Sequence, residues 1–575
     1  MKNSIYKQML VGAATAAISF GAFAADQSAT QAKTRSEMIG NLEFMRNAFH
    51  TQYAPAEWKK NFAQWDLDDQ INQSEDTLKN ATTLSTRDYR KLLMRLFLSA
   101  RDYHTSISFV STEAATLPFA VKGADGRYFI VYIDRTKLSE DVFPFQVGDE
   151  LVRFGDQSAD EAVKEILSNT IINSIQTDQE RAEQYLTSRT AARGMKVPRG
   201  PVTVGVKPKG SDTVYTRQII WEYTPEKIPT DLLAQKLLSA QKAQEGMPLL
   251  NRQMIAGDFH ATPGASLVDN PYALGARKTF TPALGKKIWQ SDDKDPFYAY
   301  IFQNTDKKLI GYIRIPSYVA SMYTTDSFAA VAHFKKLVTL FESSTDALVI
   351  DQVNNPGGSV SYLYALVSML SDQAVKTPKH RMMITPADVR DALKGLEKIA
   401  QIKSDEDAQK LLKEQLDGYP ASYETAQFFK NYYEFIVSEY QAGHTFTAPY
   451  WLEGVDQINP AQDHYTKPIL LLINGLDFSG GDFFPATLQD NKRVKTFGTR
   501  TAGAGGYVLD FTYPNSFGVD TFRLTGSIAE RVDLNPIENL GVKPDVEYSI
   551  GVDDLQNDYR GYVKAIQQTV SEMTR

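Results

Sequence analysis

Hydrophobic and polar positions divide this chain into stretches of different texture. Apolar side chains recur at helical spacing from Met38 to Phe49 and again from Tyr89 to Leu98, which predicts an N-terminal helical region over residues 25–112. Short alternating runs then predict strands up to residue 223, and from residue 290 to residue 575 strands alternate with helices, with a helical insertion over about 377–443. A chain of 575 residues exceeds one hydrophobic core, so we expect a multidomain α/β protein.

The strand-rich stretch contains one recognisable motif. Val147 to Val152 reads VGDELV, and a helix-like run follows from Asp160 to Leu167. This order resembles a PDZ domain, a small barrel that binds extended peptides by adding them as a strand, and a plain β-hairpin is the alternative. We predict a PDZ-like, β-rich domain over residues 113–223.

Regular patterning is lost between Thr224 and Trp289. Glycine and proline interrupt this stretch repeatedly, apart from an amphipathic run from Leu232 to Gln244. A linker of this length is usually either functional or disordered. We predict a linker over residues 224–289 and hypothesise that it is an inhibitory or processing segment. A connector that packs two domains together is the alternative.

The first residues have the composition of a secretory signal peptide. Lys2 and Lys7 form a charged start, Met9 to Phe20 is apolar or small, and Ala22 to Ala24 supplies an A-x-A cleavage site. We predict that residues 1–24 are removed and that the mature protein is secreted or periplasmic, with an uncleaved anchor as the alternative. No later run approaches about 18 uninterrupted apolar residues, so no membrane span is expected in the mature chain.

Charge and composition exclude several functions. The 62 basic and 69 acidic residues give a net charge of −7 without a basic stripe, so nucleic acid is not an expected partner. The chain has no cysteine, which excludes disulfides, thiolate catalysis and cysteine-ligated zinc.

Ser479 is the strongest candidate for chemistry. It follows five aliphatic residues, Ile469 to Ile473, which indicate a strand covered on both faces, and it precedes a helical run from Phe483 to Leu488. A serine at this turn presents its hydroxyl at the carboxyl edge of a sheet, where amide N–H groups at the helix N-terminus would stabilise an oxyanion. A serine that caps the helix is the alternative.

A second strand-to-helix turn has the composition of an anion-binding loop. Gly357 and Gly358 follow the strand-like run Ala347 to Ile350 and precede the helix-like run Tyr362 to Leu370. Glycine pairs let backbone amides approach a substrate closely. In combination with Gly480, they are candidates for an oxyanion hole.

These motifs, in this order, resemble the S41 serine peptidases of the C-terminal processing and tricorn-core type. The similarity runs from about residue 40 to residue 570 and is densest over residues 347–381 and 467–545. The resemblance implies a crotonase-type β/α superhelical catalytic domain over residues 290–575 and serine endopeptidase activity on protein or peptide substrates, without a cofactor or metal. It matches Ser479 to the nucleophile, and Gly480 with Gly357 or Gly358 to the oxyanion amides.

The general base departs from the commoner pattern of this family. There a lysine in a GKG sequence follows the nucleophile, whereas this chain has Ala504 between two glycines, and alanine accepts no proton. Histidine is the usual base near neutral pH, although a lone loop histidine is more often structural. His104, where a helix gives way to a strand, matches the catalytic histidine of one branch of the family. The same branch implies a zymogen and a homodimer.

A catalytic histidine needs an acid to hold its tautomer. Asp477 and Asp482 flank the nucleophile, but their short side chains suit turn and helix-capping roles. Glu538 matches the glutamate of a late ENxGVxPD motif of the family. The resemblance therefore implies a triad of Ser479, His104 and Glu538.

Two other classes of function fit the same fold. One is a non-catalytic peptide- or lipophile-binding protein, and the other is a crotonase-like acyl transfer enzyme that acts on thioesters. The PDZ-like motif and the signal peptide favour peptides over thioesters, and the retained serine, histidine and glutamate favour catalysis over binding.

Overall fold

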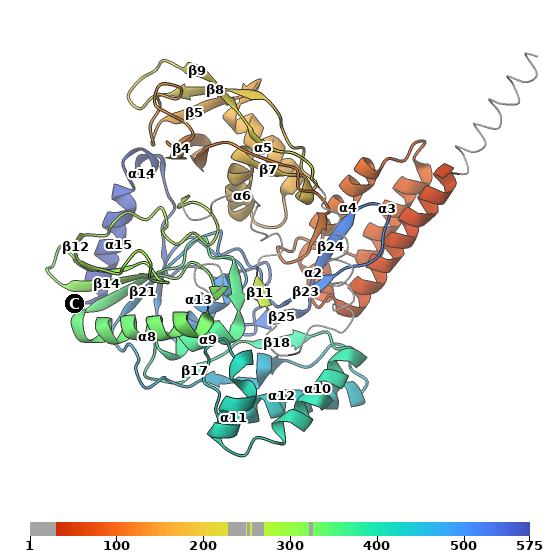
Figure 1. The fold of residues 1–575 in the computed structure, drawn as a ribbon, viewed down its shortest axis with the longest axis vertical. Helices are drawn as coiled ribbons and strands as arrows, with labels where there is room; N and C mark the ends of the chain where they lie inside the picture. The colour runs from red at the N-terminus through yellow and green to blue at the C-terminus, as the bar shows by residue number, and fades with distance from the viewer. Residues whose placement is uncertain (1–29, 228–248, 250–252, 256–269, 321–325) are drawn as a thin grey trace, which may run out of the picture.

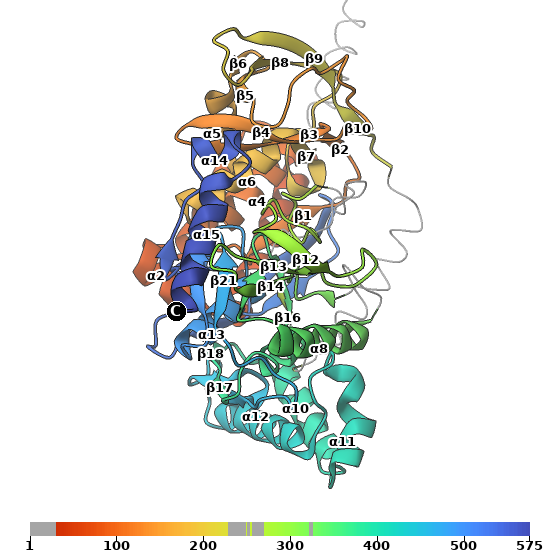
Figure 2. The same ribbon diagram turned by 90° about the vertical axis from the view of Figure 1, so that its left-hand side faces the viewer.

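The computed structural model describes residues 30–227, 249, 253–255, 270–320 and 326–575. The predicted signal peptide and the amphipathic run from Leu232 to Gln244 lie outside the described residues. The described chain is a multidomain α/β protein, with a β-rich domain at one end, a helical insertion at the other and a large sheet between them (Figures 1 and 2).

Helices form the N-terminal region, as predicted. The first is described from residue 30 and ends at residue 52, and it is followed by α2 (Ala56–Ala63), α3 (Leu67–Asn80) and α4 (Thr86–Ser99). Their apolar faces share one core with side chains from residues 517–524. Strand β1 (Ser106–Phe109) also pairs antiparallel with β24 (Val519–Thr525). The N-terminal region is therefore attached to the C-terminal part of the chain.

The β-rich domain is an antiparallel sheet covered by two helices, α5 (Ala159–Thr170) and α6 (Ile175–Thr187). Its strands lie in the order β3 (Phe119–Ala124), β4 (Arg127–Ile133), β5 (Glu150–Phe154), β8 (Pro201–Lys207) and β9 (Tyr215–Ile220). Helix α6 packs along edge strand β3, where a Cβ at Gly123 would lie 2.4 Å from Glu183 Oε1 and Lys122 Nζ lies 3.2 Å from Glu180 Oε2. Adding a peptide strand to this edge would require α6 to move.

The large sheet brings together the two strands that the sequence marked. Strand β15 (Ala347–Asp351) lies parallel and adjacent to β21 (Ile469–Ile473), and both are fully buried. Because their carboxyl ends meet at one edge, the turns that follow them also meet there. The full order is β12 (Lys286–Gln290), β13 (Ala299–Gln303), β14 (Leu309–Arg314), β15, β21, β22 (Lys495–Gly498) and β26 (Val546–Glu547). The first strand, β12, begins inside the predicted linker.

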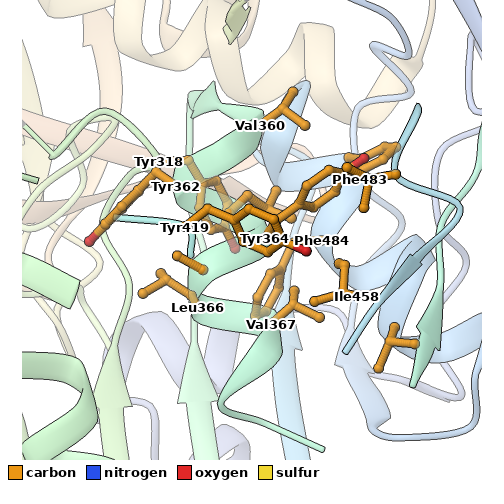
Figure 3. Packing of buried hydrophobic residues seen from close by; sticks show 14 of the residues in the cluster. Tyr318, Val360, Tyr362, Tyr364, Leu366, Val367, Tyr419, Ile458, Phe483 and Phe484 are labelled. Carbon is orange, nitrogen blue, oxygen red and sulfur yellow. The ribbon is translucent and has the colours of Figure 1, made fainter. Parts of the chain in front are cut away.

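Side chains of β21 alternate between two cores, which explains its unbroken aliphatic run. Leu471 packs into a core that includes α9 (Val360–Ser368) and α13 (Gly480–Asp490), where Tyr364, Phe483 and Phe484 lie close together (Figure 3). Leu470 and Leu472 face the opposite core, which includes helix α15 (Arg560–Met573).

The predicted helical insertion contains α10 (Pro386–Ile399), α11 (Asp405–Leu412) and α12 (Tyr423–Gln441), which lie at the lower end of the molecule in both views (Figures 1 and 2). Another helix, α8 (Ser327–Ser344), covers the same side of the sheet. Among the described residues, no helix combines the length and the apolar character needed to cross a membrane.

Candidate active site

The turn between β21 and α13 holds Ser479 in a strained backbone conformation. Its φ is 61° and its ψ is −112°, a region that residues other than glycine rarely adopt. Such strain costs about 1–3 kcal/mol and is typical of functional turns. The side chain is fully buried, and its Oγ has no hydrogen-bond partner among the described residues.

The two aspartates near Ser479 have structural partners. Asp482 accepts hydrogen bonds from the N–H of Ser479 (2.8 Å) and of Ala504 (2.9 Å), and it also accepts one from the hydroxyl of Thr501. Asp477 accepts from the N–H of Asn355 at 3.0 Å. Asp482 therefore anchors the Ser479 turn to the loop around Ala504, and Asp477 anchors it to the turn that contains Gly357 and Gly358.

The two predicted oxyanion turns touch each other. A Cβ at Gly480 would lie 3.1 Å from Gly357 Cα and 3.2 Å from Gly358 N. A Cβ at Gly358 would lie 2.0 Å from the carbonyl carbon of Tyr318, so only glycine fits there. The N–H of Gly357 already donates to Asn355 Oδ1 at 2.9 Å. The N–H of Gly358 is therefore better placed than that of Gly357 to form an oxyanion hole with Gly480.

An aspartate fixes the loop that carries His104. Asp102 Oδ1 accepts from the N–H of His104 at 2.8 Å, and Oδ2 accepts from the hydroxyls of Tyr53 at 3.0 Å and Thr525 at 2.7 Å. His104 itself is fully buried, and neither ring nitrogen has a hydrogen-bond partner among the described residues. The imidazole is thus held by its backbone while its ring remains available.

Glu538 is buried between a loop amide and a lysine. Its Oε2 accepts from the N–H of Gly505 at 3.1 Å, and its Oε1 forms an ion pair with Lys59 Nζ. Lys59 comes from α2 and is fully buried, and it also donates to Arg101 O (2.8 Å) and Asn539 Oδ1 (2.7 Å). Two segments separated by 479 residues in the sequence therefore meet at this carboxylate.

The three predicted triad segments converge. One ring nitrogen of His104 and one carboxylate oxygen each of Glu538 and Asp102 all lie within 4.8 Å of one another. Tyr103, beside His104, packs edge-on against Phe478, beside Ser479, with ring centroids 5.5 Å apart. The structure thus brings the Ser479, His104 and Glu538 segments to one place, without a hydrogen bond between their side chains.

A cluster of two carboxylates and an imidazole also has the composition of a metal site, but the oxygens are already used. Asp102 accepts bonds from backbone and hydroxyl donors, and Glu538 faces the ammonium group of Lys59. A cation there would have to displace Lys59, so this donor set fits a proton-transfer site better than a metal site.

Burial sets the protonation of the triad. It lowers the pKa of His104 to about 4, against the attraction of Asp102, so that the ring is neutral at pH 7. Burial and, to a smaller extent, the charge of Asp102 raise the pKa of Glu538 to about 8, although Lys59 acts to lower it. A neutral imidazole is the form a general base needs, and Lys59 favours the charged form of its partner acid.

The buried histidines predict acid destabilisation. Burial also lowers the pKa of His380 to about 3, from an ordinary value of 6.5. Because the unfolded chain binds a proton near pH 6.5 that the folded chain binds only at lower pH, stability should fall as pH drops below about 6.5. Urea unfolding of Ser479→Ala protein should lose roughly 2–3 kcal/mol from this group between pH 7.5 and 4.5. His380→Phe should remove that part of the loss, and an unchanged pH dependence would contradict the assignment.

Asp102 and Lys59 contact the candidate site but were not predicted from the sequence. Asp102 had a signal, because an aspartate two residues before a loop residue is typical of a turn that bonds its own backbone. Lys59 had none, since it lies in the polar helix sequence AEWKKNFA and its burial depends entirely on distant segments.

Part of the predicted linker lies on the oxyanion turn. Strand β11 (Gln253–Ile255) pairs antiparallel with β16 (Gly357–Ser359), which places Met254 opposite Gly358. Nearby, Leu249 is 2% exposed and belongs to the catalytic-domain core. Linker backbone therefore occupies the edge beside the candidate oxyanion hole.

Family comparisons match this arrangement. Residues 309–548 match the model of peptidase family S41, and residues 113–228 match a PDZ domain model. A protein of Chlamydia muridarum (strain MoPn / Nigg) is 34% identical over 558 residues, which cover 92% of this chain and 91% of the relative. A protein of Chlamydia trachomatis serovar D is 32% identical over 557 residues, covering 91% and 90%.

Solved structures agree with the sequence matches. Mature CPAF in complex with lactacystin superimposes with a TM-score of 0.81 at 30% identity, covering 94% of this chain and 99% of that chain. This chain therefore belongs to peptidase family S41, and its fold matches that of CPAF. The predicted family, the PDZ-like domain and the catalytic fold are confirmed, and the comparisons support a protease.

Proposed function

We propose that this protein is a secreted or periplasmic serine endopeptidase that uses Ser479, His104 and Glu538. The observation that carries the proposal is the convergence of the three segments on one buried site. Ser479 lies at a strained strand-to-helix turn, and a neutral imidazole and a lysine-paired carboxylate lie close together beside the neighbouring loop.

The proposed reaction follows from these positions. As Ser479 Oγ attacks the peptide carbonyl, His104 takes the hydroxyl proton and later gives it to the leaving amine, and Glu538 stabilises the imidazolium. The amides of Gly358 and Gly480 would receive the negative charge on the carbonyl oxygen. Because the described side chains make no hydrogen bond with one another, the ring must approach Ser479 when substrate binds.

The alternatives are weaker on this geometry. A peptide- or lipophile-binding protein would need neither a strained, buried serine hydroxyl without a partner nor a buried imidazole without one, and the described residues include both. The PDZ domain favours polypeptide substrates over the thioesters of acyl transfer enzymes.

Inhibitor classes separate these functions. The purified protein should release peptides from casein near neutral pH, and a sulfonyl fluoride should abolish this release because it acylates an activated serine. EDTA should leave the rate unchanged, because the candidate site uses proton transfer. Casein hydrolysis that EDTA stops and the sulfonyl fluoride does not would contradict the proposal.

We further propose that the chain is a self-processing zymogen. In the described structure, β11 occupies the backbone edge of β16 beside Gly358, so a substrate strand would compete with the linker for that position. Since His104 precedes the linker and Ser479 follows it, the two pieces must stay associated after a cut. We also propose that the protein is a homodimer, and this proposal rests on the resemblance alone. Analytical sedimentation tests it by measuring the mass of the protein in solution.

Self-processing predicts new N-termini. Concentrated wild-type and Ser479→Ala proteins, incubated separately, should differ: the wild type should acquire cuts within residues 224–289 and the variant should remain intact. Met254→Pro, which removes one backbone donor from β11, should shorten the lag before activity appears. An intact, fully active single chain would contradict the zymogen proposal.

A further inference from the structure

A cavity of about 470 Å³ lies between the N-terminal helices and the β-rich domain. Its apolar lining includes Phe97 from α4, Ile107 from β1 and Ile166 from α5. Its size falls within the range of ligand sites in proteins. The cavity also contacts Thr105, directly after His104, so an occupant would touch the loop that carries the candidate base.

The lining is strongly basic. It includes seven arginines and lysines and a single acidic residue, Glu165, although the whole chain has a net charge of −7. The basic residues are Arg87, Lys91, Arg95, Arg181, Arg189, Arg193 and Lys196. Such a concentration of one sign of charge in a concave site attracts ligands of the opposite sign.

Three of these charges form a stripe on helix α4. Arg87, Lys91 and Arg95 recur every four residues, so they share one face of the helix. None of the three forms an ion pair with a residue that the structure describes. Like charges at this spacing repel each other and destabilise the helix. An anionic ligand would relieve that repulsion.

We propose that this cavity binds an acidic peptide segment that also carries apolar side chains. The charged stripe and the basic residues of the β-rich domain would receive the carboxylates, and the apolar lining would receive the side chains between them. A peptide fits better than a small inorganic anion, because an anion would leave the apolar lining unfilled. The binding claim is independent of the proposed peptidase activity.

The test measures binding to full-length Ser479→Ala protein by fluorescence anisotropy. The probes are two fluorescein-labelled, C-terminally amidated peptides, Glu-Leu-Glu-Phe-Glu and Gln-Leu-Gln-Phe-Gln. The acidic peptide should bind at least about 10-fold more tightly than its neutral match, and the difference should shrink in high salt. Lys91→Glu with Arg95→Glu should weaken the acidic peptide at least about 10-fold, because both positions are exposed and opposite in charge to the ligand.

The matched control is Lys403→Glu, an exposed lysine between α10 and α11 in the helical insertion, which should leave binding unchanged. Circular dichroism confirms that each variant is folded. Equal binding of the two peptides, or unchanged binding to the double variant, would overturn the proposal. The proposal would also be overturned if millimolar inorganic phosphate displaced the peptide completely, because the cavity would then be a simple anion site.

Discussion

Replacing Ser479 by alanine should reduce casein hydrolysis by about 10³-fold or more, leaving only the turnover that substrate binding and the oxyanion hole supply. His104→Ala should cost about as much, and the double variant should be no worse than either single one, because the two groups act as a unit. Because neither variant can process itself, the wild type and both variants carry the same inserted protease site within residues 224–289 and are cut there before initial rates are compared.

Two buried residues provide matched controls for these variants. Ser368→Ala removes a buried hydroxyl in α9 that donates to Ala365 O at 2.8 Å, and His380→Phe removes a buried imidazole that contacts Ser527 Oγ at 3.1 Å. Both controls should retain most of the activity. Wild-type cleavage by Ser479→Ala would show that another residue is the nucleophile.

Lys59→Met should reduce kcat/KM by about 10²-fold or more at pH 7, although Lys59 does not touch the reacting bond. Without the ammonium group, the pKa of Glu538 rises further, because the charge and the hydrogen bond of Lys59 both hold it down. A protonated acid stabilises the imidazolium less well. The rise of kcat/KM with pH should therefore shift to higher pH, which a purely structural role would not cause.

The neighbouring lysine is the matched control for this effect. Lys60 lies on the same helix, is exposed and pairs with Asp66 at 3.1 Å, so Lys60→Met should leave both rate and pH profile unchanged. Removing one partner of a buried ion pair typically costs about 3–5 kcal/mol. That loss should grow as pH rises above about 8, because the carboxyl of the folded wild type is then charged while that of the folded variant still holds its proton.

A double variant separates charge from packing. Lys59→Met with Glu538→Gln removes both charges, so it should regain much of the stability lost in Lys59→Met without regaining activity. If Lys59→Met and Lys60→Met have the same pH profile as the wild type, Lys59 has no role in positioning the acid.

The strands that position Ser479 could be predicted from the sequence because their hydrophobic pattern is local. Ile469 to Ile473 is aliphatic at every position since both faces of β21 are covered, and the turn that follows contains two glycines where a Cβ would lie within 3.0 Å of a neighbouring segment. The family pattern added His104 and Glu538, which no periodicity joins to Ser479.

Other features depend on contacts between distant segments. Lys59 is buried only because residues 101 and 538–539 surround it, and nothing in its own helix indicates this. The position of β11 on β16 is likewise a pairing across about 100 residues of chain, in a stretch whose glycines and prolines indicated only a linker. The packing of α6 on the edge of the PDZ domain is a third such contact.

Covalent labelling shows directly whether Ser479 is an activated nucleophile. Processed wild-type protein should react with a fluorophosphonate probe in a 1:1 ratio, and mass spectrometry of the tryptic peptides should place the adduct on Ser479. His104→Ala, cut within residues 224–289 at the same inserted protease site, should label far more slowly, while His380→Phe should label at the wild-type rate. Casein hydrolysis without labelling, or an adduct on another residue whose loss abolishes the activity, would contradict the account.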